Sequence, residues 1–428
     1  NPDMIINDLD KTVDITFSIN EGPKVYVERI NIYGNTRTID KVIRREFSFS
    51  EGDSYNKRSI NYAKDKIKSL NFFDSVEINE ERVEDTDKLI LDVNVVEKNT
   101  GSATIGAGYG DQNGTTFTAG ISENNFLGKG QKVKVSTSIS STQNLYDISI
   151  TEPYFNNKDL LVRGDIYSKF DDPTNVNYET ETVGVGLALG FPLSRSNRIT
   201  TKYSLLNSKT KADLDATNYE RLLSGTNTVS EIGYTLSLDK RNSPYKPSAG
   251  SIFIIEQNLA GLGGTSRYLQ NKITYKKYFR INKTFIGAIK SAFGSINGYD
   301  DKYAPIDKMY NIGGKNLRGF KYGKVGPQLN TSFTGGNYYY VINIETNFDL
   351  PIDEYDISSS LFLDFGSVWG LDSRYGAIED DHKLRASVGI NLNWDSAIGP
   401  INFVLAEPFM SETTDTIDKF SFDIGYNF

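Results

Sequence analysis

The sequence predicts a mainly β fold, namely a 16-stranded antiparallel transmembrane β-barrel preceded by a small α+β domain of order β-α-α-β-β. Charged side chains fall from about a third of residues 1–98 to about a fifth of residues 99–428, which indicates two unlike parts. The second part repeats segments that alternate apolar and polar residues, as two-faced strands do. No segment approaches the roughly 18–20 continuous apolar residues of a membrane-spanning helix, whereas the half-polar strands of a barrel need no such run.

Composition excludes several classes of function. The chain has no Cys and a single His, His382, which we expect to be solvated on a loop. A disulfide framework, a zinc-thiolate site and a cysteine nucleophile are therefore excluded. The net charge of −8 and the lack of long basic runs argue against binding to nucleic acid. Because no nucleophile or His accompanies the paired carboxylates, we expect neither an enzyme nor a protein with a cofactor or metal site.

Residues 23–98 predict one small α+β domain. A segment that alternates apolar and polar residues ends at the turn pair Gly34-Asn35 and indicates a strand. Two helices follow, because apolar residues recur at helical spacing, and Thr38 is placed to cap the first helix. Alternation then returns in two further strands. The predicted elements, in order, lie at 25–35, 39–47, 56–73, 74–83 and 88–97.

Residues 1–22 do not fit inside that domain. Val13, Ile15, Phe17 and Ile19 alternate along a strand that ends at Glu21-Gly22-Pro23, and a similar segment precedes it. A lone strand would expose an unpaired edge, so we interpret this segment as the end of a preceding copy of the domain in a longer tandem array. No charged segment followed by an apolar one is present, so we expect no export signal in this chain.

Residues 99–428 predict the barrel. About 16 candidate strands give about 20 residues for each strand and its connection, close to the length of a membrane-crossing strand with a loop. Short connections alternate with long ones, as on the two rims of an outer-membrane barrel. The short connections lie at 194–197, 281–283, 351–355 and 396–399, and the long ones at 207–228, 298–335 and 371–382. The alternative is a soluble β protein whose core holds the many aromatic residues.

The connection at 298–335 is longer than the ~12–15 residues of ordinary loops, and its aromatic and apolar residues are not typical of disorder. The sequence GGKNLRGF lies at its centre. An Arg beside a Gly suits a sharp turn that aims the guanidinium at a fixed carboxylate. On the next two strands, Glu345 and Asp364 occupy inward-facing positions and are the predicted acceptors. We therefore expect an ordered loop that folds into the barrel.

GGKNLRGF resembles the conserved loop motif of the BamA family of outer-membrane insertases. Residues 23–98, with RINIYGNTRTIDKVIRREF and NFFDSV, resemble a POTRA domain, in particular the last one before the barrel. The other matching stretches are IGAGYGDQNG, NNFLGKGQ, TEPYF, LDKRNSPYKPSAG, FLDFGSVWG and KFSFDIGYNF. The resemblance implies a lumen loop motif at Leu317, Arg318, Gly319 and Phe320, with Arg318 directed at Glu345 and Asp364. It also implies that several POTRA domains precede the barrel, of which this chain retains the last and a remnant at 1–22.

The resemblance further implies a weak lateral seam between the first barrel strand, at about 103–110, and the last, at about 419–428. The seam residues would be Ile105, Ala107, Tyr109, Phe422, Ile424, Gly425, Tyr426 and Phe428. An unfolded chain could add its own strand to the edge that such a seam presents. The implied function is the assembly and insertion of β-barrel proteins into the bacterial outer membrane, with the POTRA domain in the periplasm.

The same resemblance implies the partners. They are unfolded outer-membrane β-barrel proteins, outer-membrane lipids and lipopolysaccharide, periplasmic chaperones, and accessory lipoproteins of the assembly complex such as BamD. We expect the edges of the POTRA sheet to capture an extended peptide. We also expect Arg44, Arg45 and Glu46, exposed around the first helix, to form a docking surface for a lipoprotein.

Three alternatives share some of these parts. A two-partner-type secretion pore would export a polypeptide through the lumen, a TamA-type assembly factor would have fewer POTRA domains, and a porin would need an open lumen. The remnant before residue 23, without a plug helix, argues against the secretion pore, and the inward loop argues against the porin. The GNTRTIDKVIRRE stretch favours the BamA family over the TamA type.

Overall fold

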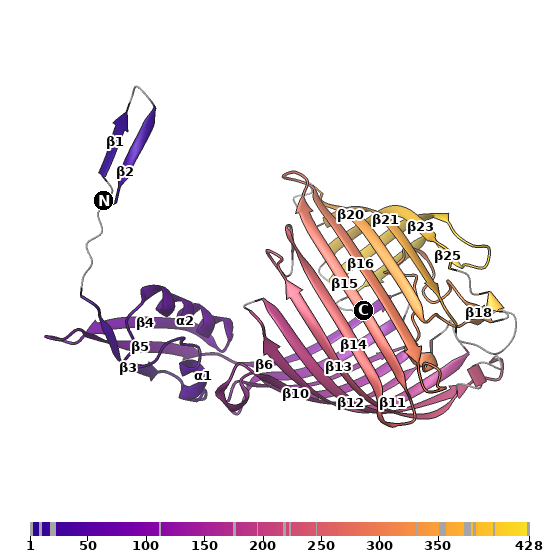
Figure 1. Ribbon diagram of the computed structural model, residues 1–428, viewed down its shortest axis with the longest axis horizontal. Coiled ribbons are helices and arrows are strands. Elements are labelled where there is room, and N and C mark those ends of the chain that lie inside the picture. Colours follow the sequence, from indigo (N-terminus) through magenta and orange to yellow (C-terminus); the bar gives the residue numbers. More distant parts are fainter. Residues whose placement is uncertain are drawn as a thin grey trace. The chain divides into compact units, whose positions relative to one another are not determined.

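A computed structural model of the chain describes residues 3–7, 11–17, 23–110, 113–173, 177–194, 196–216, 220–221, 224–244, 246–329, 332–350, 357–371, 378–379, 382–396 and 399–425. The chain divides into two compact units (Figure 1). The first contains Asn1–Thr100 together with Asn125–Gly130, and the second contains Gly101–Asn124 together with Gln131–Phe428.

The first unit contains the predicted α+β domain in the predicted order. Its elements are β3 (Tyr26–Tyr33), α1 (Asp40–Arg44), α2 (Lys57–Ser69), β4 (Phe73–Arg82) and β5 (Lys88–Glu97). The sheet order is β3-β5-β4, in which β5 is parallel to β3 and antiparallel to β4. The core is closed by fully buried aliphatic side chains from both helices and the sheet, among them Val27, Ile43, Ile60, Ile67 and Leu91.

The two helices begin differently. The side chain of Asn56 accepts hydrogen bonds from the N–H groups of Arg58 and Ser59, and so caps α2. At α1 the cap position is Ile39, which makes no side-chain cap. The prediction that Thr38 caps this helix is wrong, because the Thr38 hydroxyl instead accepts a hydrogen bond from Asn125 Nδ2 at 2.8 Å within the first unit.

A short hairpin precedes this domain in the sequence. Strands β1 (Asp3–Asn7) and β2 (Thr12–Thr16) pair antiparallel, with Asp3 opposite Thr16. The predicted strand through Ile19 therefore ends earlier, at Thr16, and Ile19 lies outside the described residues. The assignment of residues 1–22 to a preceding domain stays a prediction.

The second unit is a closed antiparallel barrel of 16 strands, which confirms the predicted fold and strand number (Figure 1). The strands are β6 (Gly101–Gly110), β7 (Gly114–Phe126), β8 (Gln131–Ser140), β9 (Gln143–Glu152), β10 (Leu161–Asp171), β11 (Tyr178–Pro192), β12 (Asn197–Ala212), β13 (Gly225–Asp239), β14 (Gly250–Gly264), β15 (Tyr268–Arg280), β16 (Ile286–Gly298), β20 (Tyr338–Asp349), β21 (Ile357–Trp369), β23 (Arg385–Ser396), β24 (Gly399–Met410) and β26 (Phe420–Ile424). The ring closes where β26 pairs with β6. Among the described residues, no helix is both long and apolar enough to cross a membrane.

Short elements lie in the connections. They are η1 (Phe155–Asn157), η2 (Ile306–Lys308), β17 (Gly319–Phe320), β18 (Gln328–Leu329), β19 (Ser332–Phe333), β22 (Ile378–Glu379) and β25 (Ile417–Asp418). The connection between β16 and β20 is the long one predicted from the sequence, and it holds η2 and β17 to β19.

The predicted long connection at 207–228 is shorter than expected, because β12 continues to Ala212 and β13 begins at Gly225. Polar residues extend β12 by pairing across the strands. The Thr182 and Ser208 hydroxyls lie 3.2 Å apart, and Lys211 Nζ lies 3.0 Å from a Glu179 carboxylate oxygen. Such cross-strand pairs stabilise a sheet without any apolar face.

The carboxylate of Glu97, at the end of β5, fastens the turn before α1. It accepts hydrogen bonds from Thr36 Oγ1 (2.9 Å), Arg37 N (2.9 Å) and Thr38 N (2.6 Å). Partial burial raises the pKa of Glu97, but these hydrogen bonds outweigh burial and lower the pKa to about 2. The charged form of Glu97 therefore stabilises the folded domain.

We expect Glu97→Gln to speed amide hydrogen exchange at residues 36–38 at least about tenfold at neutral pH, because hydrogen bonds to a charged acceptor are lost. In the unchanged chain, protection relative to intrinsic exchange should hold down to the ordinary carboxyl pKa of 4.5 and decline as the pH falls toward about 2. The variant should show no decline in that interval. Equal protection of the two proteins at neutral pH would contradict this role of Glu97.

Candidate functional site

The loop between β16 and β20 lies against the inner wall of the barrel. On β20, Ile344 is 43% exposed and faces outward, so its neighbours Asn343 and Glu345 face the lumen. Asn343 Nδ2 donates a hydrogen bond to the Asn316 carbonyl of the loop at 3.1 Å, and Glu345 contacts Arg318. The loop therefore occupies the lumen, as an ordered segment.

Arg318 is the centre of these contacts. Its Nε and Nη2 donate to the two carboxylate oxygens of Asp364 on β21, at 2.7 and 2.6 Å, and its backbone N–H donates to the same carboxylate at 3.1 Å. Nη2 also lies 3.0 Å from Glu345 Oε1. The guanidinium stacks on the Phe362 ring, 3.6 Å from its centroid. Because Arg318, Glu345 and Asp364 are all buried, the two carboxylates and the cation must remain together to avoid an uncompensated buried charge.

Further contacts fix the motif to neighbouring strands. Lys290 of β16 forms an ion pair with Glu345, and the Ser387 hydroxyl of β23 donates to the Arg318 carbonyl. The two flanking apolar residues, Leu317 and Phe320, are fully buried. They pack in a lumen cluster with Ile312, Val325, Tyr339, Val341 and Val368.

Gly319 allows the turn that this arrangement needs. Its φ is +90°, a conformation that L side chains rarely adopt. A Cβ at this position would also lie 3.0 Å from Pro408 Cγ and 3.2 Å from Ala406 Cβ on β24. The residue is therefore required both for the backbone conformation and for the close approach of the loop to the barrel wall.

The seam between β26 and β6 is short. In the described part of the chain it consists of two paired positions, Asp423 with Gly110 and Ile424 with Tyr109. By contrast, β6 pairs with β7 along its whole length, from Gly101 to Gly110. The Tyr109 and Phe422 rings stack across the seam with centroids 5.1 Å apart.

The other predicted seam residues lie in different places. Ile105 and Ala107 are exposed on β6, Ile105 at 91%, and pair with β7 but with no described residue of β26. Gly425 donates its N–H to Pro400 O of β24 at 2.9 Å rather than to β6. Tyr426 and Phe428 lie outside the described residues.

The predicted docking surface on α1 needs correction. Arg44 is exposed, and it pairs with Glu51 at 3.1 Å and with Asp40 at 3.8 Å. The side chain of Arg45 is only 13% exposed, and Glu46 is buried at 3%. The expectation that all three residues are exposed is therefore wrong, because Glu46 turns inward toward Arg45 and toward Lys66 of α2.

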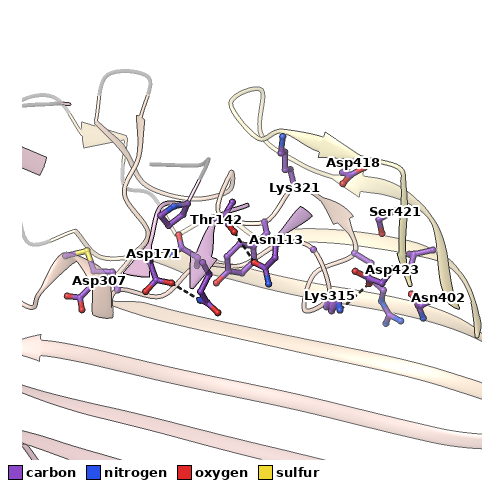
Figure 2. A pocket seen from close by; sticks show the side chains of 18 of the residues that line it. Asn113, Thr142, Asp171, Asp307, Lys315, Lys321, Asn402, Asp418, Ser421 and Asp423 are labelled. Atoms are coloured by element: carbon purple, nitrogen blue, oxygen red, sulfur yellow. Dashed lines mark hydrogen bonds and ion pairs between the residues drawn. The ribbon is translucent and has the colours of Figure 1, made fainter. Parts of the chain in front are cut away.

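A polar cavity of about 530 Å³ remains beside the loop inside the barrel (Figure 2). Lys315 and Lys321 of the loop line it together with Asp418 and Asp423 of the C-terminal segment, and Lys315 lies beside Asp423. Among the residues that the structure describes, no group of three or more His, Cys, Asp or Glu side chains could hold a metal ion.

A closed barrel with an inward, arginine-anchored loop and an N-terminal α+β domain defines a class of membrane protein. The model of the Omp85 superfamily domain matches residues 125–428, and that of the POTRA family, the surface antigen variable number repeat, matches residues 25–98. The chain therefore belongs to the Omp85 superfamily.

Its similarity to BamA proteins assigns it to the BamA family of that superfamily. The chain is 27% identical to the outer membrane protein assembly factor BamA of Neisseria meningitidis serogroup B, over 98% of this chain and 58% of that protein. The crystal structure of BamA from Haemophilus ducreyi lacking POTRA domains 1–3 superposes with a TM-score of 0.85 at 26% identity, covering 100% of this chain and 89% of that one. CdiB from Escherichia coli, at 13% identity and a TM-score of 0.64 over 99% of this chain and 80% of that one, shows the fold alone.

Several residues of the site were not predicted from the sequence. Ser387 and Lys290 support the motif from strands that carry no recognisable signal of their own. The ion pairs Lys315–Asp423 and Arg385–Asp415 join segments distant in sequence. A Lys directly after a glycine pair and an Asp in an alternating strand are individually common, so only the fold brings them together.

We expect Arg318→Ala to release the loop from the barrel wall while the barrel remains folded. Loss of one partner of a buried ion pair costs about 3–5 kcal/mol, since it leaves Asp364 and Glu345 uncompensated. Amide exchange of loop residues 314–324 should rise at least about a hundredfold. Arg318→Lys should recover only part of the protection, because an ammonium lacks the planar fork.

The matched control is Lys211→Ala, which removes an ion pair with Glu179 between β12 and β11, neither residue belonging to the loop. It should leave exchange in the loop unchanged. Unaltered loop protection in Arg318→Ala would show that the buried pair does not hold the loop in place.

Proposed function

We propose that this protein assembles and inserts β-barrel proteins into the bacterial outer membrane. The chain spans slightly more than half the length of the curated relatives that it matches, 58% and 57% for the first two. Both relatives are named outer membrane protein assembly factor BamA. The observation that carries the proposal is the short seam, at which β6 pairs with the described part of β26 only at Tyr109 and Gly110.

The mechanism is strand addition at the edge of β6. Residues 101–108 of this strand hydrogen-bond to β7 on one side and have no described partner on the other. An incoming unfolded chain can pair its own strand with this edge and so satisfy its backbone groups inside the lipid, where an unpaired N–H or C=O is costly. Burial of the client's apolar face in lipid then drives the reaction without a nucleotide.

The barrel lies in the outer membrane and the POTRA domain in the periplasm. Large apolar side chains project from the outer face of consecutive strands, including Ile121, Ile148, Ile166, Val185 and Leu205, each exposed by more than 40%. Such a surface is expected to face lipid. Outer-membrane lipids and lipopolysaccharide are thus the proposed environment of the second unit.

We further propose that the POTRA domain captures extended segments at β4. The outer edge of β3 is already occupied, because Val27 exchanges backbone hydrogen bonds with Gly52 and Asp53, and the Ile30 N–H donates to Glu51. That leaves β4 as the outer strand for strand addition. Clients delivered by periplasmic chaperones, and accessory lipoproteins such as BamD, are the proposed partners of this part.

We propose that the chain comprises three parts. Residues 23–98 form the last POTRA domain, residues 99–428 the barrel, and residues 1–22 the end of a preceding domain. Support comes from the hairpin of β1 and β2, whose apolar side chains Ile5, Ile6, Val13 and Ile15 are all exposed by at least 50%. An apolar strand pair of this kind is stable only against a further core.

The alternative is a pore that exports a polypeptide through the lumen. The loop lies in that lumen and is anchored by buried charges, which favours insertion at the wall over transport through the centre. The two mechanisms differ in whether the seam must open.

A disulfide across the seam tests this point. In this Cys-free chain, cysteines replacing Tyr109 and Ile424, which are paired residues of β6 and β26, should crosslink and abolish insertion of a barrel client into vesicles. Reduction should restore insertion. The matched control is a pair replacing Ile166 and Ile148, partners on β10 and β9, whose crosslink should have no effect.

Full insertion activity of the completely crosslinked seam would rule out strand addition at β6. Transport through the lumen would then be the better account.

A second experiment tests the docking surface on α1. Because Arg45 and Glu46 are largely covered, Arg44→Glu is the informative change, and it should weaken a lipoprotein complex several-fold, more strongly at low salt. Reversal of the exposed Arg58 on α2 serves as control. Binding that is indifferent to Arg44→Glu at every salt concentration would leave strand pairing at β4 as the remaining proposal.

A further inference from the structure

The lumen loop is joined to the segment that precedes the last strand. Strand β17 (Gly319–Phe320) pairs antiparallel with β25 (Ile417–Asp418). The pairing extends beyond both strands, since Lys321 N donates to Thr416 O at 2.9 Å and Thr416 N donates to Lys324 O at 3.1 Å. A backbone ladder of this kind fixes the loop close to β26, which begins only two residues after β25.

A side-chain contact carries this connection to the seam. Lys315 Nζ lies 3.2 Å from Asp423 Oδ2, and the two side chains lie side by side in the lining of the lumen cavity (Figure 2). Asp423 is also one of the two described residues of β26 that pair with β6, opposite Gly110. The same residue therefore belongs both to the seam and to a contact with the loop.

Arg318, three residues after Lys315, is held by strands on the far side of β24. Arg318 binds Asp364 on β21, and its carbonyl accepts from Ser387 on β23. In the strand order β21-β23-β24-β26-β6, the loop therefore contacts β21 and β23 through Arg318 and β26, on the other side of β24, through Lys315.

The C-terminal segment is itself anchored to this wall. Arg385 of β23 donates from Nε and Nη2 to the two carboxylate oxygens of Asp415, both at 3.0 Å, and both side chains are buried. The connection before β26 therefore cannot move freely. What remains adjustable is the seam end of the strand, where Asp423 lies.

We propose that the lumen loop is a latch on the seam. Lys315 holds the seam end of β26 through Asp423, so that seating of the loop and closure of the seam form one coupled equilibrium. The proposal rests on the proposed function, since it assumes that the seam opens. It adds a positioning residue, Lys315, which lies outside the buried motif that it serves.

The chemistry of this pair suits a reversible latch. Lys315 is 56% exposed to the lumen and Asp423 19%, so neither charge is stranded when the pair separates. An ion pair of this exposure shifts an equilibrium by up to about fivefold. A fivefold shift matters for the opening of a seam that has two described paired positions. The same shift would be negligible for the separation of fully paired strands.

The test is amide hydrogen exchange of the seam strands, residues 101–110 and 420–425, in the full chain reconstituted in lipid nanodiscs. Lys315→Gln leaves the sequence of both strands unchanged, and we expect it to speed their exchange two- to fivefold. Exchanging the charges, with Lys315→Asp and Asp423→Lys together, should restore protection. The matched control is Lys419→Gln, which removes an exposed ion pair with Glu407 beside the last strand and should change nothing.

Coupling is tested in a second background. With the loop already released by Arg318→Ala, Lys315→Gln should add no further increase. The same increase in both backgrounds would mean that Lys315 acts only locally, and unchanged exchange in Lys315→Gln would mean that it does not act on the seam; either result overturns the latch.

These measurements need no client. If they contradict the latch while the crosslinked seam still blocks insertion, the proposed function stands and the latch falls. If the crosslinked protein inserts clients normally, the proposed function falls, whatever the exchange rates show.

Discussion

Backbone hydrogen bonding within a bilayer must be completed by the protein itself, and this constraint governs the second unit. Most strand boundaries of the closed ring satisfy it with long ladders, such as the one between β6 and β7. The boundary between β26 and β6 has two paired positions among the described residues. The rest of the barrel thus supplies the rigidity that lets one boundary be weak, and the inner loop contacts the wall on the same side as that boundary.

The strand pattern was predictable because a two-faced strand in a membrane barrel has a period of two along its whole length, and the environment on each face is uniform. Predictions from this alternating pattern were wrong where the environment of the strand is no longer uniform. Residues 207–211 carry polar side chains on both faces, yet β12 continues through them, because hydroxyl and ion pairs to β11 replace apolar burial. In the first unit, Thr38 has the composition of a helix cap, but a neighbouring amide from Asn125 occupies its hydroxyl.

The candidate site was predictable where a buried charge requires a partner of opposite charge. A lone Arg in an apolar loop needs buried carboxylates, and alternation placed Glu345 and Asp364 on the inner face, where the structure has them bound to Arg318. Groups that remain partly exposed need no charged partner, because water solvates them. The contact between Lys315 and Asp423 could therefore not be predicted from the sequence. Their meeting depends on the register of β17 against β25, and register is set by the whole fold.

The barrel wall is uneven in height. Strands β6, β8 and β9 have ten residues each, whereas β12 has sixteen. At about 3.4 Å per residue and a tilt of about 40°, the shorter strands rise roughly 25 Å and the longer one roughly 40 Å. A bilayer that matches the shorter wall is thinner than average there, and hydrophobic mismatch loosens its packing. The lipid beside β6 would then offer a lower barrier to polar loops that must cross it, so under the proposed function the shape of the wall, and not only its weak boundary, would prepare the membrane for a new strand.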